Sequence, residues 1–400
     1  MAFILSNLLS SLDSSIGLLD SSSDLLSILQ AINVTNPTMG HGKSQKKTYD
    51  TVASLPAASV SLRGSLAVVQ TIGNWAASGN ADNGLYLCTG NDWALVQGLD
   101  STGIRPVFQG SNFGYTSGGL NPSSTNVIDK FPFSSNSNAT VVGDLTQAGR
   151  GSGGQSSQTP GYVSGNGASN VIDKFTISTD ANATDVGDLT AGRYKITGQS
   201  DTVNGFGYTS GGIEAAPGNS NVIDKFSFTS NGNATDVGNL WRESSGLAGQ
   251  SSSTHGYTTG GVKKWPPSYP SVYVNYNTIE KFPFVSGGNS SDISDLTQAR
   301  QAGAGQSSTT HGYTSGGQPA VNVIDKFTFS ADANATDLGD LTESKAEPSG
   351  QSSQTHGYAS GGYTGSPSNV INKFPFSTDA NATDIGNLTA GRYGVAGQQY

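Results

Sequence analysis

Apolar and polar residues follow one short pattern that recurs six times after residue 104. Each copy contains a Gly-Tyr segment that ends in Gly-Gly or Gly-Asn, such as HGYTSGG at residues 311–317, and an apolar segment such as NVIDKF. The Ile of the apolar segment lies at residues 128, 172, 223, 279, 324 and 371, so successive copies are 44, 51, 56, 45 and 47 residues apart. Repeats of this length are typical of propellers and solenoids.

The copy at residues 354–398 distinguishes between these two folds. It contains four short β-like segments, at residues 357–360, 369–376, 382–388 and 392–398, separated by residues that favour turns. No ten-residue segment in it has helical periodicity. Four strands in about 48 residues are typical of a propeller blade rather than a solenoid coil. The sequence therefore predicts an all-β fold in which residues 104–400 form a six-bladed β-propeller.

The order of motifs within each copy resembles a Kelch repeat. A strand ends in Tyr-x-x-Gly-Gly, a Val-Ile-Asp-x-Phe strand follows, and a turn leads to a Leu-Thr-x-x-Arg segment. The resemblance covers residues 104–400 and implies a Kelch-like propeller. The Trp that this family usually carries in its fourth strand is absent from most copies. A copper oxidase with this fold uses a Cys-linked Tyr, but the single Cys here, Cys88, lies outside the repeats.

Several repeated positions have a predicted structural role. The Gly pair is expected to bend the chain at positive φ, with Asn166 as the one tolerated replacement. The Tyr is expected to bury its ring between blades and to keep its hydroxyl at a wet edge. A Lys, preceded by Asp in four copies, predicts inter-strand or inter-blade ion pairs rather than a ring of charges around a ligand. The Arg residues are expected to share one repeat position: Arg150, Arg193, Arg242, Arg300 and Arg392.

Two repeated features raise the alternative of a metal site. His255, His311 and His356 hold equivalent positions, which on separate blades are expected to lie far apart. The turn STDANATD resembles the Asp-box turn of sialidase-like propellers, and its alternating oxygen donors make Ca²⁺ the alternative. It lacks a bidentate Glu at a suitable spacing, so the turn is interpreted as structural and no metal or cofactor is predicted. Its Asn-Ala-Thr triplet is explained by the turn rather than by glycosylation.

The ends of the propeller predict how its circle closes. The chain has six Tyr-Gly-Gly strands but seven candidate inner strands, because residues 104–112 compete with residues 392–398 for one place. The second segment matches the repeat better. We therefore expect residues 392–398 to pair with residues 114–118, so that both ends of the chain build the first blade.

Residues before the propeller form two further predicted parts. Residues 1–42 are expected to be a helical N-terminal anchor with its linker, because Leu5, Leu8, Leu12, Ile16 and Leu19 form a helical apolar stripe. A helix packed on its own domain is the alternative. Residues 43–103 are expected to form a small β module that is similar to modules in tailed-phage fibre proteins. The near-identical repeat copies are likewise similar to virion proteins of marine bacteriophages.

Composition excludes several classes of protein. The net charge of −9 argues against a nucleic-acid partner, which would require a basic patch. No apolar segment approaches the ~18 residues of a membrane span. The 15 Tyr and 15 Phe argue against a disordered chain despite 54 Gly. No nucleophile-elbow, paired-carboxylate or phosphate-loop motif is present, so we expect no enzyme.

These features together predict a non-catalytic phage virion appendage, similar to a tail fibre, that binds a host surface glycan or protein receptor through its propeller. The N-terminus is expected to contact other virion proteins in a multimeric assembly. The alternative is a structural protein that decorates or stabilises the capsid or tail without host contact. Binding predicts one atypical blade, whereas a scaffold predicts six similar blades.

The predicted binding segment is the long insert at residues 262–277, VKKWPPSYPSVYVNYN. Other copies have short Gly/Pro/Ser links there. Exposed aromatic side chains offer flat faces to sugar rings, and lysines attract an anionic surface. The alternative is that these aromatics fold back and cover the blade. The candidate ligand-binding residues are Lys263, Lys264, Trp265, Tyr269 and Tyr273.

Overall fold

A computed structural model of the chain describes residues 48–49, 66–69, 84–88, 93–98, 110, 112–157, 159–177, 179–214, 218–264 and 273–399. The chain divides into two compact units, Met1–Ile104 and Arg105–Tyr400, which we describe separately. Among the described residues, no helix is long and apolar enough to cross a membrane.

The first unit contains one four-stranded sheet within the segment where the sequence predicts a small β module. Its strands follow the order β1-β2-β3-β4, with β1 parallel to β2 and the other pairs antiparallel. They are β1 (Thr48–Tyr49), β2 (Leu66–Val69), β3 (Gly84–Cys88) and β4 (Trp93–Gly98). The predicted helical anchor, residues 1–42, lies outside the described residues.

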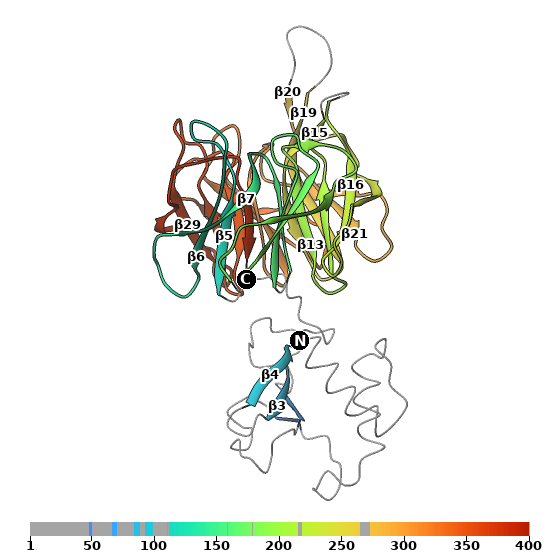
Figure 1. The fold of residues 1–400 in the computed structure, drawn as a ribbon, viewed down its shortest axis with the longest axis vertical. Coiled ribbons are helices and arrows are strands. Elements are labelled where there is room, and N and C mark those ends of the chain that lie inside the picture. Colours follow the sequence, from blue (N-terminus) through green and yellow to red (C-terminus); the bar gives the residue numbers. More distant parts are fainter. Residues whose placement is uncertain are drawn as a thin grey trace, which may run out of the picture. The chain divides into compact units, whose positions relative to one another are not determined.

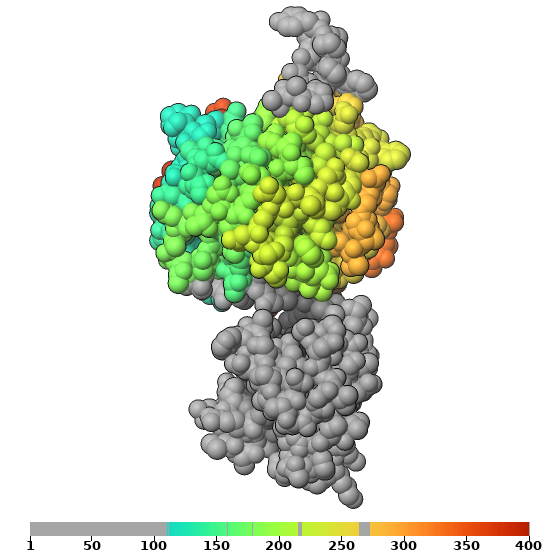
Figure 2. All heavy atoms as spheres, turned by 45° about the vertical axis from the view of Figure 1, so that its right-hand side comes forward, coloured from blue at the N-terminus to red at the C-terminus, as the bar shows by residue number. Residues whose placement is uncertain are grey.

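The second unit is a six-bladed β-propeller, as predicted (Figure 1). Successive blades follow one another around the outside in chain order, from green to orange in Figure 2. From the inner to the outer strand, blade 1 consists of β31 (Ala396–Gln399), β5 (Phe113–Ser117), β6 (Thr125–Pro132) and β7 (Thr140–Gly149). Blade 2 consists of β8 (Gly153–Ser156), β9 (Pro160–Ser164), β10 (Val171–Thr176) and β11 (Thr184–Asp188). Blade 3 consists of β13 (Thr197–Asp201), β14 (Phe206–Ser210), β16 (Val222–Ser227) and β17 (Thr235–Asn239).

Blades 4 to 6 repeat this arrangement, and blade 4 has an extra short strand, β20 (Tyr273–Asn275), that pairs with β19. A separate two-stranded sheet joins β12 (Arg193–Tyr194) to β15 (Ile213–Glu214). In the same order, the main strands of blade 4 are β18 (Ser245–Ser251), β19 (His255–Lys264), β21 (Thr278–Pro283) and β22 (Ser291–Asp295). Those of blade 5 are β23 (Ala304–Ser307), β24 (His311–Ser315), β25 (Val323–Thr328) and β26 (Thr336–Asp340). Those of blade 6 are β27 (Ser349–Ser352), β28 (His356–Ser360), β29 (Val370–Pro375) and β30 (Thr383–Asn387).

Both ends of this unit build blade 1, which confirms the predicted closure. The C-terminal strand β31 pairs antiparallel with β5, and Ala396 lies opposite Ser117. Of the competing segment, residues 104–112, the structure describes Gly110 and Asn112, and the Gly110 N–H donates to the Ser352 carbonyl of blade 6 over 2.8 Å. The circle of blades therefore closes through the last strand of the chain.

Aromatic side chains fill the spaces between neighbouring blades. Tyr162 of blade 2 stacks on Phe228 of blade 3, with ring centroids 4.8 Å apart, and also meets Phe226 at 5.4 Å. The prediction of a wet hydroxyl is wrong. Tyr162 is only 1% exposed, and its hydroxyl donates to the Phe228 carbonyl over 3.0 Å, because the third strand of the next blade ends within its reach. Burial raises the pKa of Tyr162 to about 12.

The Gly before each Tyr is required by close packing within the blade. A Cβ atom on Gly312 would lie 2.3 Å from the tip of Phe327 on the neighbouring strand, closer than real atoms approach. The Gly pair at the end of the same strand has φ values of +65° and +126° at Gly316 and Gly317, as predicted. These two requirements account for both kinds of Gly in HGYTSGG.

Two polar side chains of each repeat connect a blade to its neighbour at all six boundaries. The inner-strand Gln donates from its side chain to the carbonyl of the Tyr in the next blade, as Gln250 does to Tyr313 over 2.9 Å. The Asn of the outer turn accepts a hydrogen bond from the outer strand of the preceding blade, as Asn182 does from the Asp144 N–H over 3.0 Å. The recurrence of Asn in this turn therefore has an inter-blade cause.

Candidate functional site

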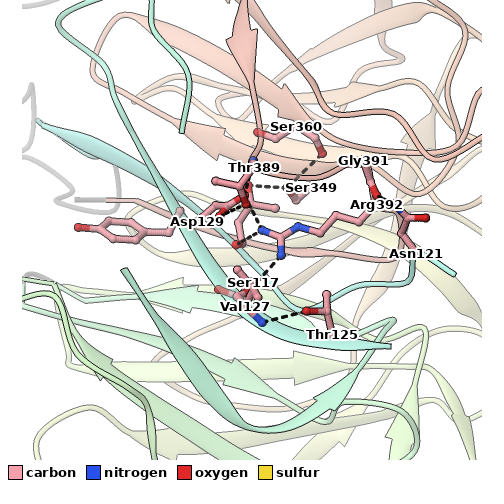
Figure 3. A network of polar contacts seen from close by, with 12 residues as sticks. Ser117, Asn121, Thr125, Val127, Asp129, Ser349, Ser360, Thr389, Gly391 and Arg392 are labelled. Carbon is pink, nitrogen blue, oxygen red and sulfur yellow. Dashed lines mark hydrogen bonds and ion pairs between the residues drawn. The ribbon is translucent and has the colours of Figure 1, made fainter. Parts of the chain in front are cut away.

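A polar cluster joins the third strand of each blade to the end of the preceding blade. Comparing this cluster around the propeller shows which blades depart from the repeat. At the closing boundary, Asp129 of β6 accepts hydrogen bonds from the Thr389 hydroxyl (2.7 Å) and N–H (2.9 Å) (Figure 3). Arg392 forms a 2.9 Å ion pair with the same carboxylate, and both charged side chains are almost fully buried. Arg392 also donates to the carbonyls of Val127 and Thr116. We call this Asp-Thr-Arg arrangement the boundary cluster.

The boundary cluster varies around the propeller. Arg193 pairs with Asp224 and Arg300 pairs with Asp325 in the same way. Asp173 of blade 2 has Thr146 but no Arg, and burial raises its pKa while the Thr146 hydrogen bonds oppose the rise. At the boundary between blades 5 and 6, the corresponding pair is Lys345 and a neutral Asn372.

The prediction that five Arg residues share one position is wrong for two of them. The carbonyl of this position accepts a hydrogen bond from the second Gly of the Gly pair, and Gly149 and Ser244 occupy it where Arg was expected. Arg150 and Arg242 are one residue after and two residues before these positions. Their guanidinium groups lie over aromatic rings instead, Arg150 over Tyr393 at 5.9 Å.

The boundary before blade 4 departs most from the repeat. Trp241 replaces the Thr of the boundary cluster, and Glu280 replaces the Asp. The Trp241 N–H donates to the Glu280 carboxylate over 3.0 Å and to the Ser290 hydroxyl over 2.7 Å, and Ser290 donates to the same carboxylate over 2.6 Å. Burial raises the pKa of Glu280, while the hydrogen bonds that its carboxylate accepts from Ser290 and Trp241 oppose the rise. The Ser290 hydroxyl thus donates to the acid in place of the missing Thr hydroxyl.

The Trp241 side chain is 60% exposed, at a position where the Thr of the other five copies is also exposed. Its two neighbours contact the base of the insert from blade 4. Arg242 lies over the Tyr276 ring at 4.8 Å, and Glu243 forms a 3.1 Å ion pair with Lys263. Two separate departures from the repeat, the 241–243 tripeptide and the insert, therefore meet at one place.

The lysine after the boundary acid also behaves differently before blade 4. Lys130, Lys281 and Lys326 form the predicted inter-blade ion pairs with an acidic residue in the next outer turn, at 2.5–2.7 Å. The turn of blade 4 has Gly287 and Gly288 instead. Lys225 of blade 3 accordingly lies over the Phe206 ring of its own blade at 3.8 Å.

The structure describes three of the five predicted site residues at least in part. Tyr273 begins β20 and is 62% exposed. Lys263 is half-buried and pairs with Glu243, so it is a structural partner of the insert base as well as a surface cation. The backbone of Lys264 lies in β19, opposite Tyr273. Trp265 and Tyr269 lie outside the described residues.

The sequence interpretation missed Trp241, Arg242 and Glu243. The signal was present, since Trp241 stands where every other copy has Thr. Among the described residues, the exposed aromatic side chains are Trp241, Tyr273 and Tyr363. Tyr273 lies in β20, and Trp241 and Tyr363 lie in connections at the same end of the propeller, opposite the C-terminus (Figure 1). We call the group Trp241, Arg242, Glu243, Lys263, Tyr273 and Tyr276 the blade-4 surface.

The three repeated histidines do not come together. His255, His311 and His356 begin the second strands of three separate blades, and each ring contacts the hydroxyl of the preceding Thr at 2.8 Å. Burial lowers the pKa of each His. Over the part of the chain that the structure describes, no three His, Cys, Asp or Glu side chains are grouped so as to hold a metal ion.

Comparison with known proteins adds no relative: no protein-family model and no curated protein sequence matches this chain.

Proposed function

We propose that this chain is a non-catalytic phage virion appendage that binds a host surface glycan through the blade-4 surface. The observation that supports binding is the coincidence of departures from the repeat at one blade. Five boundaries keep a Thr that binds an acid or its amide, whereas the sixth exposes a Trp beside a five-stranded blade. A scaffold built only from inter-blade contacts has no use for this exposed Trp.

The chemistry of the blade-4 surface suits a carbohydrate. Trp241 and Tyr273 present flat apolar faces, on which sugar rings stack, and the Tyr hydroxyl and Trp N–H can bond to sugar hydroxyls. Arg242 and Lys263 add cationic groups that favour acidic sugars. The connections that carry these residues rise from rigid strands, which is the usual arrangement for binding loops.

The phage assignment depends on the resemblance of the repeats and of the first unit to phage virion proteins. In this proposal residues 1–42 join other virion proteins, and several copies of the chain stand on one particle with the propeller facing the host. The receptor class, a glycan rather than a protein, follows from the exposed aromatic faces.

Adsorption of the purified full chain to host cells tests the proposal. Trp241→Ala alone and the pair Trp265→Ala with Tyr269→Ala should each weaken adsorption and leave the melting curve unchanged, because Trp241 keeps its backbone hydrogen bond to Glu280. Val285→Ala is the matched control, since Val285 is 79% exposed on the same blade, in the turn at the opposite end.

Three outcomes decide between the candidate functions. Loss of adsorption in the aromatic variants but not in the control supports host binding. Wild-type adsorption in both aromatic variants contradicts it. Failure of the wild-type chain to adsorb, together with normal incorporation into particles, would favour the alternative of a structural protein that decorates the capsid or tail.

A further inference from the structure

Six equivalent residues surround one mouth of the propeller axis. All have positive φ, between +54° and +68°, and we call them the axial ring: Gly151, Lys195, Gly246, Ala302, Glu347 and Gly394. Their backbones are joined by hydrogen bonds from each residue to the next, with Ile196 providing the N–H for one link. The axial ring lies at the insert-bearing end, because Ser245 pairs with Val262 at the base of the insert.

Only two members of the axial ring are charged, and they face each other. Lys195 and Glu347 are three positions apart in the circle of six, so they enter from opposite blades, 3 and 6. The Lys195 Nζ lies 3.7 Å from the Glu347 Oε1 across the axis. Their left-handed backbone costs roughly 1–2 kcal/mol for a side-chain-bearing residue and nothing for Gly. Two charged residues at Gly-type positions are therefore unexplained by the fold alone.

The opposed charges stand at a cavity of about 120 Å³ on the axis. Its wall combines the axial ring with small inner-strand residues and with the apolar side chains of Ile196, Leu247 and Val395. Five of the six ring residues donate their backbone N–H to another member of the ring, and Lys195 and Glu347 are the charged residues of the lining. At ~30 Å³ per water molecule, the space equals roughly four waters or one small organic molecule.

We propose that this cavity binds a small zwitterion of the aliphatic α-amino-acid class. The ligand's carboxylate would bond to Lys195, its ammonium group to Glu347, and its short side chain would contact the apolar wall. The present Nζ–Oε1 distance of 3.7 Å is longer than the ~2.7–2.9 Å of a charge-assisted hydrogen bond. A simple anion would face Glu347 and a simple cation would face Lys195, so neither fits both charges.

Opening the pair costs little, which makes replacement by a ligand favourable. The two side chains are 30% and 20% exposed, and partly solvated ion pairs contribute only ~0–1 kcal/mol. A zwitterion would exchange this one long contact for two short ones. This site is separate from the blade-4 surface, and its occupancy does not depend on glycan binding.

Calorimetric titration of the full chain with L-alanine tests the proposal, with sodium propionate and ethylammonium chloride as the singly charged analogues. L-alanine should bind with a stoichiometry of one, and the analogues should bind at least tenfold more weakly. Lys195→Gly and Glu347→Gly should each weaken L-alanine binding about tenfold or more, because each removes a hydrogen bond to a charged group. Both variants should fold, since Gly suits the local φ.

Ala168→Gly is the matched control, because Ala168 also has a positive φ, +71°, but is exposed and lies outside the cavity. It should bind L-alanine as the wild type does. Absence of L-alanine binding at tens of millimolar, or equal binding by the wild type and the two Gly variants, would overturn the proposal and leave the pair as a tie between opposite blades.

Discussion

The closing boundary cluster allows a prediction whose size can be worked out from the structure. Arg392→Met keeps a flexible, unbranched side chain but removes the guanidinium group and its charge. The change eliminates the 2.9 Å ion pair with Asp129 and two hydrogen bonds to backbone carbonyls. Removing one partner of a buried pair costs ~3–5 kcal/mol, because the other charge stays buried. That is a large part of the ~5–15 kcal/mol of a typical domain.

The loss should depend on the acid that stays buried without its partner. Adding Asp129→Asn should restore most of the stability, because Asn372 occupies the same place opposite Thr342 and exchanges hydrogen bonds with it.

Urea unfolding followed by circular dichroism measures these effects. Lys130→Ala is the control, because its pair with Asp180 is partly exposed and should contribute under ~1 kcal/mol. A cost for Arg392→Met no larger than that of the control, or no recovery on adding Asp129→Asn, would refute the role assigned to the buried pair.

Three further predictions follow from the same structure. Deleting residues 392–400 removes β31 and should lower the melting temperature sharply in a thermal scan, unless blade 1 is stable with three strands. Glu280→Gln should gain stability relative to the wild type as pH rises above 4.5, the ordinary pKa of a Glu carboxyl. Burial raises the pKa of Glu280, so the stabilising effect of the protonated acid in the wild type is lost as pH rises through the folded-state pKa. Urea midpoints of the two proteins that run parallel at all pH values would contradict this. Deleting residues 1–42 should leave a folded propeller that no longer joins particles, and continued assembly would show that this segment is not the anchor.

The propeller and its closure could be predicted from the sequence because they depend on repeated backbone requirements. The Gly pair and the spacing of the apolar segments allow only short strands and tight turns, and residues 392–398 match the repeat better than residues 104–112. The Tyr hydroxyl was mispredicted because the whole side chain is buried, and the partner of Tyr115, Tyr162 and Tyr208 is a backbone carbonyl in the next blade. No pattern within one repeat indicates that carbonyl.

The candidate site was harder to predict for a related reason. Arg150 and Arg242 match Arg392 by residue type, but shifts of one or two residues in an irregular connection turn the side chain from the boundary to the surface. Periodicity cannot resolve such shifts, since it describes strands rather than connections. The contact between the 241–243 tripeptide and the insert likewise joins two segments that only the fold brings together.

The pairing of Trp241 with Glu280 has a consequence for how this gene can change. Trp241 lies in the connection between β17 and β18, and Glu280 lies in the third strand of blade 4, so a crossover anywhere between them would separate the two residues and leave a Trp facing an Asp. A crossover in the outer strand at the end of a blade would keep each acid with the connection that precedes it. The heritable module of this propeller is therefore a blade together with its preceding connection, and variants with new surface specificity should arise by exchange of such segments.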